Sequence, residues 1–319
     1  MKILVTIPVE ERHKRQLESI APHATFFYQS AKDIERDLVW QMDIIIGNVG
    51  PDKIAGTKNL KWIQLNSAGT DGYLAEGVLP KGAKLTNATG AYGLAISEHM
   101  VGMTLGLKKK LYLYGKNQAE GIWRDEGEVS SIWNSVTLVL GLGDIGSEFA
   151  FRMKALGSYV IGIRRTKAEK PDFVDELYQM EHLDECLGRA DIVAMSLPGT
   201  KETYRLMNRE RFRKMKRDAI LLNVGRGTAV DTQALCDALE QGWIGGAGLD
   251  VTDPEPLPEG HRLWKAPNLM LTPHVSGQYH LKETHERILQ IAFYNLKAFL
   301  SGNELKNIVD FETGYRAIR

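Results

Sequence analysis

The pattern of hydrophobic and polar positions in the first ninety residues changes repeatedly between two types. Short apolar runs alternate with stretches of helical periodicity, such as residues 10–20. This alternation is typical of a parallel β-sheet with helices on both faces. The strands predicted in this part lie at residues 2–7, 24–28, 43–48, 62–66 and 84–87.

Apolar runs and helical stretches alternate again between residues 136 and 277. Helices are predicted at residues 147–156 and 231–242, the second with an acidic residue at its start and a glycine at its end. The apolar runs between them favour a second parallel sheet. Its predicted strands lie at residues 136–140, 158–163, 191–197, 219–224, 247–251 and 268–272.

Two longer helical stretches, 92–118 and 279–300, separate and follow these series. The first is predicted to be one long, partly buried helix, in which we expect His99 and the methionines to pack in a core. The second is long enough to carry the chain back to the domain that contains the first series of strands. We therefore predict an α/β protein of two doubly wound parallel-sheet domains, with residues 92–277 inserted in a domain formed by residues 1–91 and 278–319.

Three glycines follow the apolar run of residues 136–140 at the spacing Gly-x-Gly-x-x-Gly. Gly141 allows a tight turn, Gly143 allows the backbone to approach a pyrophosphate, and Gly146 allows the next helix to pack closely on the strand. The pyrophosphate would bind at the N-terminus of that helix, where N–H groups and the helix dipole favour anions. The flanking strands and helix favour a dinucleotide site over the alternative, a glycine-rich turn that binds nothing.

The charges of the chain balance, with 40 basic and 40 acidic residues among 319. This balance gives no electrostatic reason to expect nucleic acid or an anionic membrane as a partner, and no apolar run has the length of a membrane span. We expect the basic clusters 108–110 and 211–217 to be solvated helix faces. Two cysteines, with neither a signal peptide nor a metal-ligand motif, indicate a cytoplasmic protein without a metal site.

Three ionisable residues follow predicted strands in the second series. Arg226 stands between two glycines, where a guanidinium presents a planar fork to a carboxylate. His274 follows a proline, and histidine is the usual proton donor near neutral pH. Glu255 lies in the proline-rich segment 253–258, which is suited to holding a carboxylate beside an imidazole. Each has an ordinary alternative as an ion pair, a loop histidine or a solvated turn, but together they form a set suited to carbonyl reduction.

Small residues also collect at strand ends in the first series. The segments 47–50 and 66–71 consist largely of such residues and include Ser67, Ala68 and Gly69. In open α/β sheets, ligands bind beyond the carboxyl ends of the strands, where backbone N–H groups can meet a carboxylate. Ordinary turns explain these two segments equally well.

These motifs together resemble the D-isomer-specific 2-hydroxyacid dehydrogenase family, which includes D-lactate dehydrogenase, glyoxylate/hydroxypyruvate reductase and phosphoglycerate dehydrogenase. The similarity covers nearly the whole chain, and the order and spacing of its motifs are specific. It implies a Rossmann cofactor domain inserted in a flavodoxin-like substrate domain, and a homodimer formed through residues 92–118. The matching motifs are residues 141–146, 197–200 with Thr203, 223–227, 248–251, 253–258 and 272–274.

The resemblance also implies catalytic roles. Arg226 would hold the carboxylate and the carbonyl group of a small 2-keto or 2-hydroxy acid. His274, paired with Glu255, would give a proton to the carbonyl oxygen as hydride leaves the nicotinamide.

Further contacts with the two ligands follow from the same resemblance. The backbone of Ser67, Ala68 and Gly69 would bind the substrate carboxylate, and Asp250 would contact the nicotinamide carboxamide. The cofactor would also contact Gly141, Gly143, Asp144, Ile145, Gly146, Pro198, Thr203, Val224, Gly225 and Gly277.

The end of the second predicted strand of the cofactor domain departs from the pattern of NAD-preferring relatives. Those carry an acidic residue there, about 20 residues after the last glycine, to hold the ribose 2′-hydroxyl. This chain has Arg164, Arg165 and Thr166 instead. A carboxylate would repel a 2′-phosphate, whereas two guanidinium groups and a hydroxyl would bind it. We therefore predict NADP(H) over NAD(H), with a solvated basic turn as the alternative.

The leading prediction is an enzyme that transfers hydride from NADPH to a 2-keto acid of the glyoxylate, hydroxypyruvate or pyruvate type, giving the (R)-2-hydroxy acid. A non-catalytic, dinucleotide-sensing corepressor on the same scaffold would keep the same three residues, but the neutral charge and the absence of tails stand against it. Formate or phosphite oxidation is less favoured, because formate enzymes of this group have glutamine in place of Glu255. The sequence does not specify the keto acid or the physiological direction; Val49, Tyr73 and Tyr279 are candidate walls of the pocket.

Overall fold

The computed structural model describes residues 1–311 and divides into two compact units. The first unit consists of Met1–Tyr92 and the chain that follows Gly277, and the second consists of Gly93–Gly277. Tyr92 therefore lies in the first unit rather than in the inserted one, because its hydroxyl donates a hydrogen bond to the carbonyl oxygen of Asn66. Residues 312–319 of the expected first domain lie outside the described part.

The first unit contains a parallel sheet with the strand order β2-β1-β3-β4-β5. This is the flavodoxin-like order of a doubly wound sheet, as expected. Its strands are β1 (Lys2–Val5), β2 (Thr25–Tyr28), β3 (Ile44–Ile46), β4 (Trp62–Gln64) and β5 (Lys84–Thr86). Its helices are α1 (Glu11–Ile20), α2 (Arg36–Val39), α3 (Pro51–Ile54) and α10 (Lys282–Leu300).

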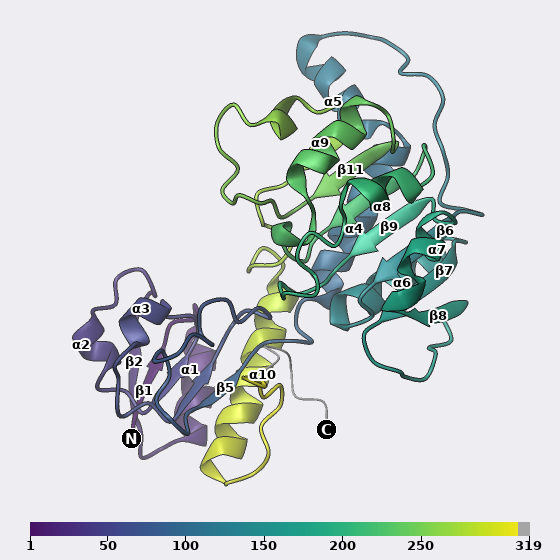
Figure 1. Cartoon of the computed structure of the whole chain (residues 1–319). Helices are drawn as coiled ribbons and strands as arrows, with labels where there is room; N and C mark the ends of the chain where they lie inside the picture. The colour runs from purple at the N-terminus through teal and green to yellow at the C-terminus, as the bar shows by residue number, and fades with distance from the viewer. Residues whose placement is uncertain (312–319) are drawn as a thin grey trace. The chain divides into compact units, whose positions relative to one another are not determined.

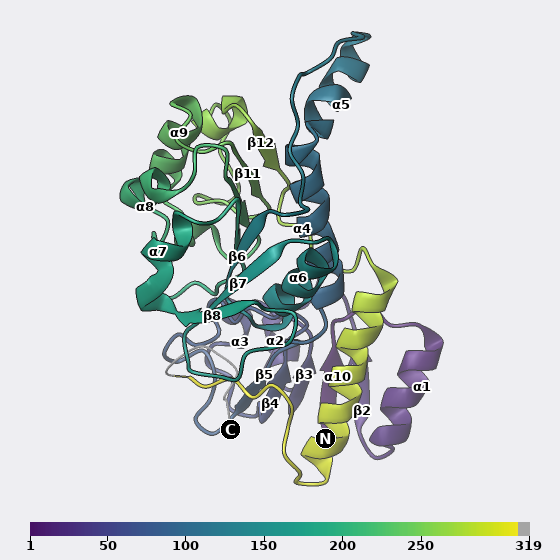
Figure 2. The same ribbon diagram turned by 90° about the vertical axis from the view of Figure 1, so that its right-hand side faces the viewer.

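Helix α10 returns to the first unit and covers one face of its sheet. The ring of Trp62 stacks on Phe299 with 5.3 Å between centroids, and Asn295 Nδ2 donates to Gln64 Oε1 at 2.7 Å. Helix α1 contacts α10 beside this face (Figure 2). On the opposite face, Ile63 belongs to a hydrophobic core that includes residues from α2 and α3. The alternation of strands and helices along the sequence thus corresponds to a sheet with helices on both faces.

The second unit is built on a parallel sheet with the strand order β12-β11-β10-β9-β6-β7-β8. Counted from the central β6, this is the Rossmann order extended by β12. The strands are β6 (Val136–Leu140), β7 (Tyr159–Arg164), β8 (Glu176–Gln179), β9 (Ile192–Met195), β10 (Ile220–Asn223), β11 (Gly246–Leu249) and β12 (Leu269–Leu271).

Helices cover both faces of this second sheet (Figure 1). The α-helices are α4 (Gly93–Lys108), α5 (Leu111–Glu120), α6 (Asp144–Ala155), α7 (Leu183–Leu187), α8 (Arg209–Lys214) and α9 (Thr232–Glu240). Short 3₁₀ turns occupy Met180–His182, Gly227–Ala229 and Arg262–Lys265. Helices α4 and α6 contact each other, and α4 also contacts β10, β11 and β12. None of the helices described in residues 1–311 has the length and apolar character needed to cross a membrane.

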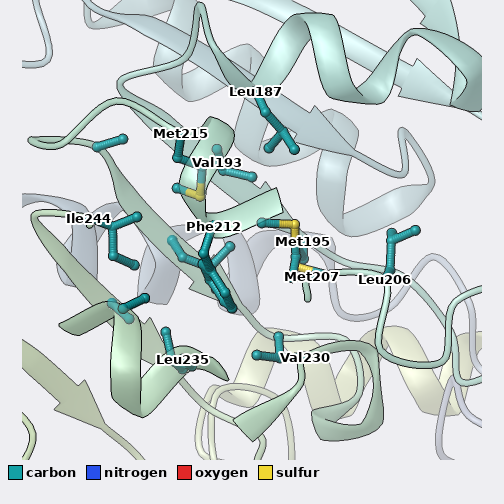
Figure 3. Close-up of a cluster of buried hydrophobic side chains, with 14 of the residues drawn as sticks. Leu187, Val193, Met195, Leu206, Met207, Phe212, Met215, Val230, Leu235 and Ile244 are labelled. Atoms are coloured by element: carbon teal, nitrogen blue, oxygen red, sulfur yellow. The ribbon is translucent and has the colours of Figure 1, made fainter. Parts of the chain in front are cut away.

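The face opposite α4 carries the large hydrophobic core of the second unit. Phe212 of α8 is fully buried there, together with Leu187 of α7 and Leu235 of α9 (Figure 3). Met195 of β9 contributes from the sheet. Three short helices therefore share one apolar layer, which holds the carboxyl ends of β9, β10 and β11 in fixed positions.

The stretch 92–118 is not one helix, contrary to the prediction. Helix α4 ends at Lys108 and α5 begins at Leu111, because Lys110 adopts a left-handed conformation with φ of 55°. Met100 and Met103 are buried, as expected of core residues, and the buried side of α4 continues to Lys108. Helix α4 is therefore buried on one side as far as its last residue.

The basic clusters are not simple solvated faces either. Lys108 is only 7% exposed, donates from Nζ to Ser130 Oγ at 3.3 Å, and has its pKa lowered by burial. In the second cluster, Arg211 Nε lies 2.8 Å from the carboxylate of Asp184, and Lys214 pairs with the same carboxylate. Both clusters thus contain side chains that support the structure of the second unit.

Candidate active site

The turn between β6 and α6 requires its three glycines for three different reasons. Gly141 has φ of 91°, which side chains disfavour. A Cβ on Gly146 would lie 1.9 Å from the carbonyl oxygen of Gly141, so only glycine lets α6 begin this close to the strand. A Cβ on Gly143 would meet no protein atom within 4 Å, so the space beside this residue is open. This combination fits the close approach of a pyrophosphate at Gly143.

Backbone N–H groups at this turn are available to an anion. In the described part of the chain, the N–H groups of Leu142, Gly143 and Ile145 donate to no protein acceptor. The carboxylate of Asp144 accepts the N–H of Gly93 at 2.9 Å and so joins the first turn of α6 to the start of α4. Because the N-terminus of a helix favours anions, the turn fits a dinucleotide pyrophosphate.

Arg164, at the end of β7, lies against the glycine turn. Its Nη2 donates to the carbonyl oxygen of Leu142 at 2.8 Å. Its Nε is buried and has no hydrogen-bond partner within residues 1–311. Arg165 and Thr166 follow directly and are exposed. Two guanidinium groups and a hydroxyl therefore lie at the carboxyl end of β7, which pairs with β6, the strand before the glycine turn.

The loop after β9 is shaped by Thr203. Its hydroxyl donates to the carbonyl oxygen of Pro198 at 2.7 Å and accepts the N–H of Thr200 at 2.9 Å. Thr203, which was expected to contact the cofactor, thus supports the backbone of its own loop through its hydroxyl. The next loop lies close by, since a Cβ on Gly225 would come within 2.3 Å of the carbonyl oxygen of Leu197. Val224 continues the ladder by donating to Met195 at 3.1 Å.

Arg226 is held between two glycines that cannot be larger residues. Beyond the restriction at Gly225, a Cβ on Gly227 would lie 1.9 Å from the carbonyl oxygen of Thr252. Asn223 Nδ2 donates to the carbonyl oxygen of Arg226 at 2.9 Å, and Arg226 Nη1 donates to that of Gly225 at 2.8 Å. Close packing on both sides therefore fixes the backbone that carries this guanidinium.

His274 and Glu255 form a hydrogen-bonded pair. His274 Nδ1 lies 2.7 Å from Glu255 Oε1, and the other carboxylate oxygen accepts the N–H of Thr252 at 3.3 Å. The two side chains remain 50% and 40% exposed, so a ligand can reach the imidazole. A carboxylate on Nδ1 orients the ring and leaves Nε2 as the nitrogen for proton transfer.

Asp250, directly after β11, connects the loop after that strand to the segment around His274. Its carboxylate is 1% exposed and accepts hydrogen bonds from Thr272 Oγ1 at 2.6 Å, from the N–H of Val275 at 3.0 Å, and from both the N–H and the hydroxyl of Ser276. Four donors match the acceptor capacity of a carboxylate. A contact with the nicotinamide, as the resemblance implied, would have to replace one of them. In this structure, Asp250 anchors the loop that carries His274.

Strand register brings the predicted catalytic residues to one edge of the second sheet. Asn223 of β10 pairs with Leu249 of β11, which pairs with Leu271 of β12. Arg226 and His274 each follow three residues after these strand ends, and Asp250 follows directly after β11, between them. Gly277 is the last residue of this unit. The glycine turn lies at the carboxyl end of β6 in the same sheet.

A loop at the carboxyl edge of the first unit's sheet is held in a similar way. Asn48 and Asn66 each accept the backbone N–H of the other, at 3.0 and 2.6 Å, and Asn48 Nδ2 donates to Ser67 Oγ at 3.1 Å. Among residues 1–311, no protein acceptor receives the N–H groups of Ser67, Ala68 and Gly69. Three successive N–H donors on an anchored loop fit a carboxylate ligand.

Two of the three candidate pocket walls are wrong. Val49 and Tyr73 are buried in the core of the first unit, where the Tyr73 hydroxyl donates to the carbonyl oxygen of Val49 at 2.8 Å. Both side chains therefore have almost no surface left to contact a ligand. Tyr279 is 36% exposed, stacks edge to face on His285, and has its pKa raised by burial to about 12.

The prediction from sequence missed several polar residues around Asp250. Thr272 and Ser276 hold its carboxylate, and His99, expected only to pack in a core, bonds to Thr272. Thr272 and Ser276 flank the histidine segment, which was a usable signal. Nothing in sequence spacing links them to His99. In the described residues, no cluster of three or more histidine, cysteine or acidic side chains is arranged to hold a metal ion.

Comparison with known proteins agrees with this geometry. The family described as D-isomer specific 2-hydroxyacid dehydrogenase, NAD binding domain, matches residues 101–276. The glyoxylate reductase of Thermofilum pendens is 32% identical over 84% of this chain and 80% of its own length.

Solved structures extend the similarity to nearly the whole chain. A D-isomer specific 2-hydroxyacid dehydrogenase family protein from Aeromonas salmonicida is 31% identical, with a TM-score of 0.85 over 97% of this chain and 99% of that one. An NADPH-dependent glyoxylate/hydroxypyruvate reductase from Sinorhizobium meliloti, in complex with NADP and sulfate, is 26% identical, with a TM-score of 0.82 over 98% and 99% of the two chains. The glycine turn, the paired His274 and Glu255, and these matches show that the chain belongs to the D-isomer-specific 2-hydroxyacid dehydrogenase family.

Proposed function

We propose that this protein reduces a small 2-keto acid of the glyoxylate, hydroxypyruvate or pyruvate type to the (R)-2-hydroxy acid with NADPH. The observation that carries the proposal is the hydrogen bond between His274 and Glu255, at the sheet edge that also bears Arg226. The names of similar proteins, glyoxylate reductase and NADPH-dependent glyoxylate/hydroxypyruvate reductase, support the substrate class and the cofactor.

The chain's own residues would move the proton and hold the substrate. When bound, the nicotinamide supplies hydride to the carbonyl carbon. The electron pair of the carbonyl bond then moves to oxygen, and His274 donates its Nε2 proton there, so that a hydroxyl forms. Glu255 holds the imidazole through Nδ1 and so fixes the orientation of the ring. In the oxidative direction the same imidazole accepts the proton.

Arg226 and the first-unit loop would bind the acid group. A guanidinium presents paired N–H donors to a carboxylate or a carbonyl oxygen, which favours substrate and developing negative charge together. The N–H groups of Ser67, Ala68 and Gly69 offer further donors to the carboxylate. Asn48 and Asn66 hold that loop rigid, so little ordering is required on binding.

Arg164, Arg165 and Thr166 would recognise the ribose 2′-phosphate of NADP(H). The guanidinium of Arg164 lies against the glycine turn. Its buried Nε, which has no hydrogen-bond partner among residues 1–311, makes this position costly without an anion nearby. A phosphate at the guanidinium would offset that cost. Pro198, Thr203, Val224 and Gly225 would form the floor of the cofactor site on the neighbouring strand ends.

We also propose a homodimer that uses residues 92–118 and the chain that follows them. Large apolar side chains stand exposed along this region, including Leu111, Ile122, Val129 and a fully exposed Trp123. Such a surface is typical of an interaction site, and sedimentation of the purified protein would measure its oligomeric state. A cytoplasmic location fits the two buried, unpaired cysteines, Cys186 and Cys236.

The test of the reaction is the loss of NADPH absorbance with glyoxylate, hydroxypyruvate and pyruvate in turn, followed by chiral analysis of the product. We expect turnover with at least one of these acids and an (R)-hydroxy product where the product is chiral. Tight NADPH binding without turnover of any 2-keto acid would instead favour the dinucleotide-sensing corepressor.

A further inference from the structure

We propose that His99 and Thr272 are positioning residues for His274. They form a hydrogen-bonded chain that runs from His99 of α4, through Thr272 directly after β12, to the buried carboxylate of Asp250, and so to the loop that carries the imidazole. This inference rests on the proposed function, because it assigns His274 as the proton donor.

The loop depends on Asp250 for its conformation. His274 has φ of 53°, a left-handed conformation that is unusual for a residue with a side chain. Its own N–H donates to the backbone oxygen of Asp250 at 2.8 Å, and the N–H groups of Val275 and Ser276 donate to the carboxylate. Three successive residues are therefore hydrogen-bonded to one aspartate. A displacement of that aspartate would displace the imidazole with it.

Thr272 connects Asp250 to His99. Thr272 Oγ1 lies 2.6 Å from Asp250 Oδ1 and 3.1 Å from His99 Nε2. The hydroxyl has one proton, and an ionised carboxylate can only accept, so the hydroxyl donates to Asp250. Its oxygen must then accept from His99, which requires a proton on Nε2. The contacts therefore specify the tautomer of His99 and the direction of every hydrogen bond in the chain.

His99 comes from a part of α4 that is packed closely on the sheet. A Cβ on Gly106 would lie 2.7 Å from the sulfur of Met270 on β12, and a Cβ on Gly248 of β11 would lie 3.1 Å from the sulfur of Met103. Residues 99, 103 and 106 share one helical face, since they are four and seven residues apart. That face packs on β11 and β12, so the position of His99 is fixed relative to both strands.

Paired variants separate positioning from general packing. Thr272→Val removes the hydroxyl at nearly constant volume, whereas Thr272→Ser keeps it. His99→Leu removes the Nε2 donor, whereas His99→Gln places an amide donor near the same point. We expect Thr272→Val and His99→Leu to lower kcat roughly 10- to 100-fold, because a misplacement of about 1 Å at a catalytic group has effects of this size. The Ser and Gln variants should stay within about threefold of wild type.

The readouts distinguish this inference from the proposed function. The dissociation constant for NADPH, measured by fluorescence, and the KM for the keto acid should be nearly unchanged in all four variants, and ¹⁵N NMR of wild type should find His99 protonated at Nε2. Unchanged kcat in both Thr272→Val and His99→Leu, equal losses in Val and Ser, or an Nδ1-protonated tautomer would overturn the inference. Absence of turnover in wild type would overturn the proposed function, while the tautomer measurement would still test the hydrogen-bonded chain.

Discussion

His274 Nδ1 lies 2.7 Å from Glu255 Oε1, although 19 residues separate them and each lies in a loop. The hydrogen bond is possible because β11 and β12 end in register, so that the loops after them meet. Both side chains keep about half of their surface exposed to solvent. An exposed ion pair contributes little to stability, so this pair is better explained by the control of the imidazole.

The pair should matter for turnover and little for folding. We expect His274→Ala to lower kcat by about 10²–10⁴, the usual contribution of a general acid, and Glu255→Gln by about tenfold. Steady-state kinetics with the best keto acid would measure both, and thermal melting would check that the fold is intact. NADPH affinity should survive in each variant. Retained turnover in His274→Ala would exclude its role as the proton donor.

Arg164 and Arg165, at the end of β7, should decide which cofactor the enzyme prefers. Replacing them by Arg164→Asp together with Arg165→Ala removes both guanidinium groups and adds a charge that repels the 2′-phosphate. We expect the ratio of kcat/KM for NADPH to that for NADH to fall by roughly 10²-fold or more, because charge-assisted hydrogen bonds contribute about 1.5–3 kcal/mol each. Lys167→Ala, an exposed neighbour, is the matched control. A wild-type preference for NADH would contradict the assignment.

The sequence predicted strands that form an apolar or aromatic run and missed the strand that does not. Strand β6 is an apolar run buried along most of its length, so its pattern was clear. Strand β8, Glu176–Gln179, was not predicted, because a glutamate and a glutamine enclose its two central residues and leave no apolar run. The break between α4 and α5 depends on one left-handed lysine, for which residue type gives no signal.

The residues of the candidate active site also fall into a group that could be predicted from the sequence and a group that could not. Arg226, Glu255 and His274 could be predicted because local motifs mark each one. The partnership of His99 with Thr272 spans 173 residues and is created by the packing of α4 on β12, so no local pattern contains it. The sequence also did not predict the four hydrogen-bond donors to the carboxylate of Asp250, because only the folded loop brings them together.

Substitutions at Gly146 and Gly143 should separate effects on stability from effects on cofactor binding. Gly146→Ala forces a Cβ against the carbonyl oxygen of Gly141, so we expect the melting temperature to fall by about 3–10 °C. Gly143→Ala meets no protein atom and lies in an extended conformation that alanine can adopt, so the melting temperature should hardly change. Its methyl group should instead weaken NADPH binding, measured by fluorescence titration, by roughly tenfold or more. Unaltered NADPH affinity in Gly143→Ala would place the pyrophosphate elsewhere.

The anchored loop of the first unit should control substrate affinity. Asn48→Ala removes the acceptor of the Asn66 N–H and the donor to Ser67 Oγ. The N–H groups of residues 67–69 then lose their fixed direction, so we expect the KM for the keto acid to rise roughly tenfold, with a smaller change in the KM for NADPH. Asn59→Ala is the control, because Asn59 makes an exposed hydrogen bond to Trp40 before β3 and β4 begin, at the edge of the sheet opposite to the loop. Equal effects of both substitutions on KM would contradict a role of the loop in binding.

Acid should weaken the edge of the second sheet at Glu176. Hydrogen bonding to Arg189, with further bonds from Tyr178 and Tyr159, lowers the pKa of this carboxyl group to about 2. Its pKa in the unfolded chain is about 4.3, so the ionised form stabilises the fold above that pH, and the stabilisation is lost as the pH falls toward 2. Since the pair is partly exposed, we expect it to contribute about 1 kcal/mol or less. Between pH 5 and about pH 2.5, the urea midpoint of wild type should therefore fall more steeply than that of Arg189→Gln, because the variant lacks the main group that lowers the pKa. Parallel curves for the two proteins would show that Arg189 does not hold Glu176 ionised.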